Sequence, residues 1–182
     1  METMTAAVGG LSRTDLESLR EVAHDRRRYE LIDGVIVVTP SPSRRHQRVA
    51  RGVQAQLSNL SEQLIGLFAP LDVDLASDTT VQPDLLVVDR TEFDDEARPV
   101  RPLLVVEILS PSTSRIDQLL KRERYERASV PSYWIIDPAG PSVTVCELRD
   151  GQYVEAATAT GNETIDVQLP ARLTLRPAGW LD

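Results

Sequence analysis

Two short apolar runs bounded by prolines constrain the fold of this chain more than any other feature of its sequence. They span residues 84–88 and 103–109, and nearly every position in them is Leu, Val or Ile. A strand that is exposed on one side alternates apolar and polar residues, whereas an unbroken apolar run of this length is typical of a strand covered on both faces. The sequence therefore predicts a central sheet with other layers packed against both of its sides.

Helices are expected around these strands, because apolar residues recur three and four positions apart in three other segments. The segments are a short helix that ends near His24, a long helix over 44–64 and a third helix over 115–128. In the short helix, Thr14 and Glu17 have the spacing of a capping box. The third helix is expected to bury Ile116, Leu119 and Leu120.

Further strands are predicted around two hairpin turns and towards the C-terminus. Asp33-Gly34 and Asp150-Gly151 separate strand-like runs, and such pairs tolerate the positive φ that tight turns require. The remaining strands are expected over 67–76, 132–136, 143–148, around 153, and as edge strands over 164–169 and 172–175. This order indicates a mixed α/β sandwich. We expect residues 1–10 to form a loose arm and residues 11–182 to form a single domain.

Composition excludes several classes of protein. The 182 residues include 20 basic and 28 acidic side chains, and the net charge of −8 argues against a non-specific nucleic-acid coat while permitting a local basic groove. The single cysteine, Cys146, excludes an internal disulfide framework. No segment reaches the roughly 18 uninterrupted apolar residues of a membrane span, and the N-terminus does not resemble a signal peptide. A cytoplasmic location is therefore expected.

Two carboxylates fall in the buried strands. Asp84 begins the first apolar run and Glu107 lies inside the second. Burying a carboxylate is costly unless it is paired, hydrogen-bonded or bound to a cation. Mg²⁺ would suit two such groups, because it takes one or two carboxylates and keeps its other positions for water and phosphate. The alternatives are that Asp84 bonds to loop amides and that Glu107 forms a buried salt bridge with an arginine.

Lysine occurs once in this chain. Among the 20 cationic residues it is Lys121, and all the others are arginine. Arginine cannot release a proton near neutral pH. The pKa of a lysine, in contrast, can be shifted by its surroundings, and its ammonium group is a compact charge. Lys121 is therefore a candidate catalytic residue. The alternative is a pairing with Asp117, four residues earlier, on a solvated helix face.

Basic residues gather at the start of the predicted long helix. They are Arg44, Arg45, Arg48 and Arg51, with His46 among them. Positive charge at a helix N-terminus opposes the helix dipole, so the cluster is a candidate for binding substrate phosphates. A solvated basic patch and a capping histidine are the alternatives. Because only 4% of the residues are aromatic, binding of single-stranded nucleic acid through base stacking is not expected.

An ordered set of short motifs resembles the Uma2 family. The motifs are YELIDG (29–34), PSP (40–42) with His46 after it, PD (83–84), VEILSPS (106–112), KR (121–122) and VPSYWIID (130–137). That family was formerly a domain of unknown function and is classed with the restriction-endonuclease-like proteins of the PD-(D/E)XK nuclease superfamily. The resemblance implies a nuclease core in which a mixed sheet is flanked by helices, here with an N-terminal helix and hairpin and a β-rich C-terminal tail.

The resemblance also implies functional roles. Asp84 and Glu107 match the two metal-binding acids and would hold Mg²⁺ or Mn²⁺, and Glu30 matches a third acidic position. The superfamily usually has a lysine two residues after the second acid, where this chain has Leu109, and Lys121 is similar to a lysine that has migrated to the next helix.

The implied activity is metal-dependent hydrolysis of DNA phosphodiester bonds by a homodimeric endonuclease. Two alternatives remain open. The fold could have lost catalysis and serve as a binding module, or the substrate could be another phosphate ester such as RNA.

Overall fold

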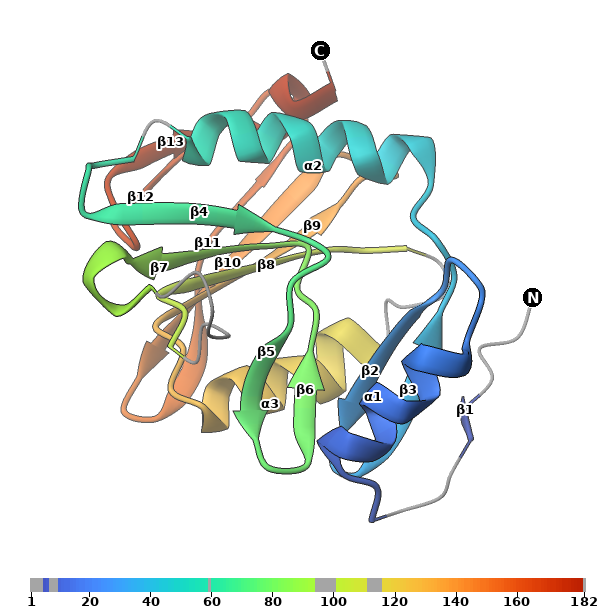
Figure 1. The fold of residues 1–182 in the computed structure, drawn as a ribbon. Coiled ribbons are helices and arrows are strands. Elements are labelled where there is room, and N and C mark those ends of the chain that lie inside the picture. The colour runs from blue at the N-terminus through green and yellow to red at the C-terminus, as the bar shows by residue number, and fades with distance from the viewer. Residues whose placement is uncertain (1–4, 7–9, 59, 94–100, 111–115, 182) are drawn as a thin grey trace.

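The computed structural model describes residues 5–6, 10–58, 60–93, 101–110 and 116–181. Its centre is a mixed six-stranded sheet in the order β11-β10-β9-β8-β7-β4 (Figure 1). The strands are β4 (Leu64–Phe68), β7 (Leu85–Asp89), β8 (Leu104–Ile108), β9 (Ser132–Asp137), β10 (Ser142–Arg149) and β11 (Gln152–Thr160). Strands β8 and β9 are parallel, and the other neighbours are antiparallel. The mixed α/β fold predicted from the sequence is thus confirmed.

A second, smaller sheet has the order β1-β3-β2-β6-β5. Its strands are β1 (Thr5–Ala6), β2 (Arg28–Ile32), β3 (Val35–Thr39), β5 (Val73–Ala76) and β6 (Thr79–Val81). The predicted turn between β2 and β3 is confirmed, with φ of 52° at Asp33 and 71° at Gly34. A third, two-stranded sheet pairs β12 (Ile165–Val167) with β13 (Leu173–Leu175).

Helices and the smaller sheet cover the two faces of the six-stranded sheet (Figure 1). Helix α2 (Arg44–Leu57) packs Val49, Val53 and Leu57 on one face, in a core with Trp134. On the other face, Tyr133 packs with Tyr125 of α3 (Arg122–Arg127) and with apolar residues of the smaller sheet. Helix α1 (Arg13–Val22) lies against the smaller sheet. The prediction that the apolar strands are covered on both sides is therefore confirmed.

Two predicted element boundaries are wrong. Helix α2 ends at Leu57, and Leu64 begins strand β4. The strand expected over 67–76 is divided between β4 and β5, with Pro70 in the connection. Within residues 1–10, which were expected to form a loose arm, Thr5 and Ala6 pair with β3, and residues 1–4 and 7–9 lie outside the described part of the chain.

Two local predictions for helices are also wrong. The capping box of α1 is formed by Ser12 and Asp15 rather than by Thr14 and Glu17. The third helix begins as a π-helical turn, η2 (Ile116–Lys121), and continues as α3. Leu119 and Leu120, which were expected to be buried, are 69% and 42% exposed, and the side chain of Ile116 lies outside the described residues.

Among the described residues, no helix combines the length and the apolar character needed to cross a membrane.

Candidate active site

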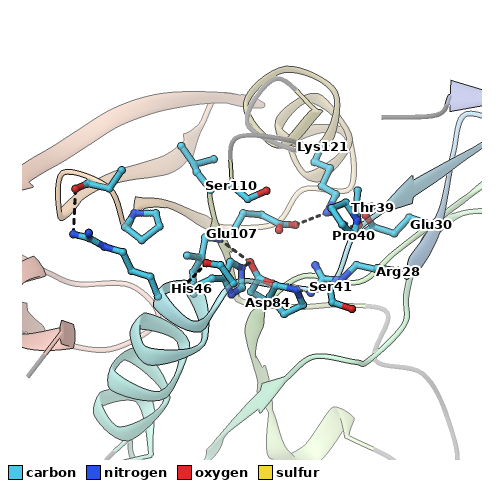
Figure 2. Close-up of a pocket in the computed structure, with 17 residues that line it drawn as sticks. Arg28, Glu30, Thr39, Pro40, Ser41, His46, Asp84, Glu107, Ser110 and Lys121 are labelled. Carbon is cyan, nitrogen blue, oxygen red and sulfur yellow. Dashed lines mark hydrogen bonds and ion pairs between the residues drawn. The ribbon is translucent and has the colours of Figure 1, made fainter. Parts of the chain in front are cut away.

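A cavity of about 450 Å³ opens where the smaller sheet, the start of α2 and the centre of the large sheet meet (Figure 2). Six of the residues singled out from the sequence line it, namely Glu30, Arg45, His46, Asp84, Glu107 and Lys121. The other three predicted arginines, Arg44, Arg48 and Arg51, line a separate open hollow on α2 together with Gln47. The structure therefore brings the acidic residues and the lysine together and divides the arginine cluster between two places.

Lys121 lies between two buried carboxylates. Its Nζ atom is 2.8 Å from Oε1 of Glu30 and 3.1 Å from Oε1 of Glu107. The side chain of Lys121 is only 2% exposed and those of both glutamates 1%. The solvated helix face considered for Lys121 is thus wrong, and the buried salt bridge that the structure shows for Glu107 is with Lys121. The side chain of Asp117 is outside the described residues.

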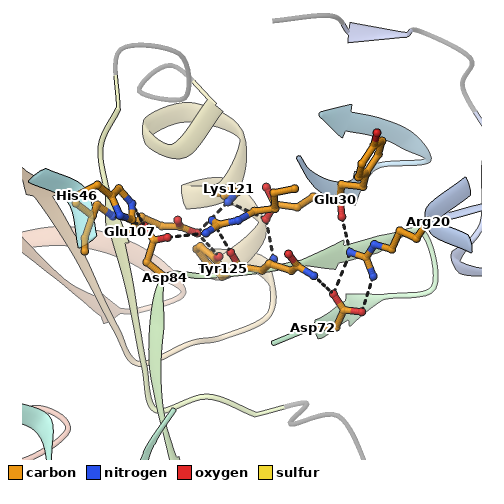
Figure 3. Close-up of polar contacts among 12 residues, drawn as sticks. Arg20, Glu30, His46, Asp72, Asp84, Glu107, Lys121 and Tyr125 are labelled. Atoms are coloured by element: carbon orange, nitrogen blue, oxygen red, sulfur yellow. Dashed lines mark hydrogen bonds and ion pairs between the residues drawn. The ribbon is translucent and has the colours of Figure 1, made fainter. Parts of the chain in front are cut away.

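Two further groups fix the glutamates (Figure 3). The Tyr125 hydroxyl donates to Oε1 of Glu107 at 2.7 Å, and the backbone N–H of Gln82 donates to Oε1 of Glu30 at 2.7 Å. Burial, and then the negative charges of Glu107 and Glu30, raise the pKa of the Tyr125 hydroxyl well above its ordinary value. Tyr125 therefore stays protonated and acts as a hydrogen-bond donor.

Asp84 is held by three donors. Nη2 of Arg28 lies 2.9 Å from Oδ1, while Nε2 of His46 lies 3.0 Å from Oδ2 and the backbone N–H of Ile108 donates to Oδ2 at 2.8 Å. Burial opposes ionisation of Asp84, but the His46 and Arg28 contacts outweigh it, so the pKa of Asp84 is lower than its ordinary value. Asp84 is consequently ionised across the whole neutral range.

Simple features of the strands explain why these groups converge. Strand β7 runs antiparallel to β8 with Leu85 opposite Val106, so Asp84, one residue earlier, falls beside Glu107. Successive side chains of a strand point to opposite faces, which places Arg28 and Glu30 on one face of β2. Lys121 and Tyr125 are four residues apart, and both reach Glu107 from the helix that follows β8.

Helix α2 contributes His46 through its capped first turn. The Ser43 side chain caps the helix by accepting from the backbone N–H of His46 at 3.2 Å. The Nδ1 atom of His46 is buried and has no hydrogen-bond partner among the described residues. Ionised Asp84 requires Nε2 of His46 to carry the proton that it shares with Oδ2.

The donor set fits a hard divalent cation held by few protein ligands. Asp84 and Glu107 present carboxylate oxygens to the same cavity, which matches the one or two carboxylates that Mg²⁺ takes. The described residues contain no cluster of three or more His, Cys, Asp or Glu side chains arranged to hold a metal ion. The remaining positions around an ion would therefore be filled by water or by substrate oxygens.

Sequence reasoning missed two of the residues that complete this arrangement. Arg28 is one of many arginines, and its only distinguishing signal is that it precedes Glu30 by two residues on a predicted strand. Tyr125 follows Lys121 by four residues, which places the two side chains on one helix face. Both spacings are visible in the sequence, but neither indicates that Arg28 pairs with Asp84 or that Tyr125 pairs with Glu107.

Comparison with known proteins supports the same fold. The chain is similar to a crystal structure described as "a putative nuclease belonging to DUF820" from Anabaena variabilis ATCC 29413, with a TM-score of 0.67 and 17% sequence identity, covering 94% of this chain and 98% of that chain. A search among curated proteins found no match.

The family comparison covers nearly the whole chain. The Uma2 model, described as "Putative restriction endonuclease", matches residues 14–178. That range contains every residue of the cavity. We conclude that the chain belongs to the Uma2 family.

Proposed function

We propose that this protein is a Mg²⁺-dependent endonuclease that hydrolyses DNA phosphodiester bonds. The observation that carries the proposal is the convergence of Glu30, Asp84, Glu107 and Lys121 on one cavity, although they come from two sheets and a helix. Three buried carboxylates, two of them paired with Lys121 and one with Arg28 and His46, are costly to maintain for stability alone. Membership of a family described as "Putative restriction endonuclease" supports the same conclusion.

In this proposal, the residues of the cavity have separate roles in hydrolysis. Asp84 and Glu107 would hold Mg²⁺ or Mn²⁺, and the bound ion would stabilise charge on the phosphate and acidify a water molecule. Lys121 would orient the attacking water by donating from Nζ, because an ammonium group offers three donors and no acceptor. Glu30 holds Nζ in place, and Tyr125 holds the carboxylate of Glu107.

DNA would reach the cavity along α2. Arg45 and His46 line the cavity itself, while Arg44, Arg48 and Arg51 line the hollow on the same helix. Helix α2 contains no acidic residue, so it is a local basic element in an acidic protein. These groups would contact backbone phosphates, which position the substrate without reading its sequence. We expect a homodimer for cleavage of both strands, which sedimentation with and without DNA would test.

The test is cleavage of plasmid DNA, single-stranded DNA and RNA with Mg²⁺ or Mn²⁺. We expect the wild-type protein to cut DNA only when metal is present, and Asp84→Ala, Glu107→Ala and Lys121→Ala to lose the activity. Arg149→Gln is a matched control, because Arg149 pairs with Glu147 on the surface away from the cavity. Cleavage that survives all three alanine substitutions would contradict the proposal, and cleavage confined to RNA would reassign the substrate.

One observation favours a second candidate, a nuclease fold that binds a partner without hydrolysis. Each cavity carboxylate already has a cationic partner, and Leu109 lines the cavity where a lysine is usual in the superfamily. This candidate predicts no heat of Mn²⁺ binding in calorimetry for the wild-type protein. The endonuclease proposal predicts metal binding that Asp84→Ala and Glu107→Ala abolish.

A further inference from the structure

Arg28 is a cation in the cavity with hydrogen-bonding capacity left over. Its Nη1 donates to the backbone carbonyl of Gln82 at 3.0 Å, and its Nη2 donates to Oδ1 of Asp84 at 2.9 Å. A guanidinium group carries five N–H donors, so contacts within the described part of the chain use fewer than half of them. The side chain is 20% exposed and lines the cavity. Arg28 therefore combines unused donors with exposed surface in the cavity wall.

Lys121 is placed differently. Its ammonium group is enclosed and pairs with both Glu30 and Glu107, so two negative charges already offset its positive charge. Leu109, two residues after Glu107, also lines the cavity and offers no charge. A positive group that can meet an incoming phosphate must come from elsewhere in the cavity wall.

The position of Arg28 suits that role. Its guanidinium is anchored to Asp84, which is one of the two proposed metal ligands, so a phosphate oxygen approaching an ion on Asp84 would also approach Arg28 (Figure 2). The planar fork of arginine matches phosphate geometry with two parallel hydrogen bonds. Burial opposes the charge of Arg28, but the carboxylates of Asp84, Glu30 and Glu107 outweigh it and raise the pKa further above its ordinary value. Arg28 is thus a permanent cation.

We propose that Arg28 is a further catalytic residue whose guanidinium binds the non-bridging oxygens of the substrate phosphate beside Asp84. There it offsets the charge that develops on these oxygens during hydrolysis, a role for which preorganised donors are effective. No bond is made or broken at Arg28. The catalytic part of this inference rests on the proposed function, whereas the binding of a phosphate group does not.

The binding experiment uses inorganic phosphate and calorimetry without added metal. We expect Arg28→Gln to weaken phosphate binding about 10- to 100-fold, since a charge-assisted hydrogen bond is lost. Arg28→Lys keeps the positive charge but lacks the planar guanidinium group, so we expect an intermediate loss of phosphate affinity. Arg149→Gln should bind like wild type. Equal binding by wild type and Arg28→Gln, or no phosphate binding by wild type, would overturn the inference.

A second measurement separates catalysis from support of Asp84. Single-turnover cleavage at saturating DNA is expected to be at least about 100-fold slower in Arg28→Gln, while affinity for Mn²⁺ is kept or increased, because removing a cation beside Asp84 does not weaken its attraction for another. If Arg28 only orients Asp84, Mn²⁺ affinity falls and additional Mn²⁺ restores the rate, which would overturn the catalytic role. Thermal unfolding of both variants confirms that they fold.

The two proposals can fail separately. Phosphate binding that depends on Arg28, in a wild-type protein that cuts no DNA, would overturn the endonuclease proposal and support an anion site at Arg28. DNA cleavage that Arg28→Gln leaves unchanged would support the endonuclease and overturn the role of Arg28.

Discussion

The ammonium group of Lys121 lies where a positive charge is most needed, between two carboxylates that are almost fully buried. Removing one partner of a buried ion pair leaves a charge without compensation. We therefore expect Lys121→Met to lower the free energy of unfolding by about 3–5 kcal/mol, measured by urea denaturation. Addition of Mg²⁺ should recover part of the loss, because the ion would replace the missing charge. A loss below about 1 kcal/mol would show that Lys121 contributes little to stability.

Tyr125 and Tyr153 offer a matched pair of buried hydroxyl groups. The Tyr125 hydroxyl donates to a carboxylate at 2.7 Å, and the Tyr153 hydroxyl donates to the carbonyl oxygen of Val130 at 2.8 Å. Hydrogen bonds to charged groups contribute about 1.5–3 kcal/mol and those to neutral groups about 0.5–1.5 kcal/mol. Tyr125→Phe should therefore cost more stability in chemical denaturation than Tyr153→Phe. The reverse order would contradict the assignment of charge to Glu107.

The pH dependence of stability should report on Asp84. Its pKa is lowered in the folded protein, so the unfolded chain takes up a proton first as the pH falls. The stabilising contribution is complete above the unfolded pKa of about 3.9 and is lost as the pH falls through the lower folded value. The difference in unfolding free energy between wild type and Asp84→Asn should be constant near neutral pH and shrink in acid. A difference that grows in acid would contradict this.

At the level of single residues, the sequence indicated the acids and the lysine because each was unusual where it stood. Glu107 interrupts an apolar run, Asp84 begins one, and Lys121 has no other lysine to share its role. Arg28 and Tyr125 could not be found in this way, since an arginine in an arginine-rich chain carries no such signal. Their roles follow from contacts between segments far apart in sequence.

Helix α2 depends on a close approach to the C-terminal turn η3 (Pro177–Leu181). A Cβ atom at Gly52 would lie 2.7 Å from the Cα atom of Trp180, and Trp180 also donates from Nε1 to the Gln56 side chain at 2.9 Å. Alanine normally stabilises the interior of a helix by about 1 kcal/mol relative to glycine. Here we expect Gly52→Ala to destabilise the protein by about 1–3 kcal/mol.

Thermal unfolding checks this expectation, with Gly140→Ala as the control. A Cβ atom at Gly140 meets nothing within 4 Å, so that substitution should be nearly neutral. If Gly52→Ala raised the melting temperature, helix propensity would outweigh the contact with Trp180. In that case η3 would have to shift away from α2 without a loss of stability.

The errors in the predicted elements have physical causes. Leu60 and Leu64 continue the apolar spacing of α2 because the loop and β4 that follow pack against the same core as the helix, so periodicity alone overextended it. The segment before α3 is π-helical, and its hydrogen bonds span five residues. The 3.6-residue period therefore assigned Leu119 and Leu120 to the wrong face.

Charge is distributed unevenly over the molecule, and this should govern the DNA binding that we propose. Against a net charge of −8, α2 presents Arg44, Arg48 and Arg51 around one hollow. The logarithm of DNA affinity falls against the logarithm of salt concentration with a slope of about −0.9 per neutralised phosphate. Replacing all three arginines with glutamine should therefore make the slope shallower by about 2–3, as measured by fluorescence anisotropy.

The control for this prediction replaces Arg149 and Arg172, which are exposed and do not line the hollow. Their loss should leave the slope almost unchanged. A slope that does not respond to Arg44, Arg48 and Arg51 would place the path of DNA elsewhere on the molecule.

The fold class was accessible from the sequence because it depends on patterns within segments, and the large sheet confirms it. The arrangement of the site was less accessible because it depends on how two sheets meet. Glu30 is in the smaller sheet, and its lysine partner follows β8, the third strand of the large sheet along the chain. No periodicity within either segment encodes that contact.

Because the site is divided between two sheets, a partly folded molecule would have an incomplete site. A partly folded molecule with only the large sheet in place would carry Asp84 and Glu107 without Glu30 or Arg28. The proposed nuclease activity would then arise only when the smaller sheet has packed against the large sheet. For the endonuclease that we propose, nascent and damaged chains would then be unable to cut the DNA of their host.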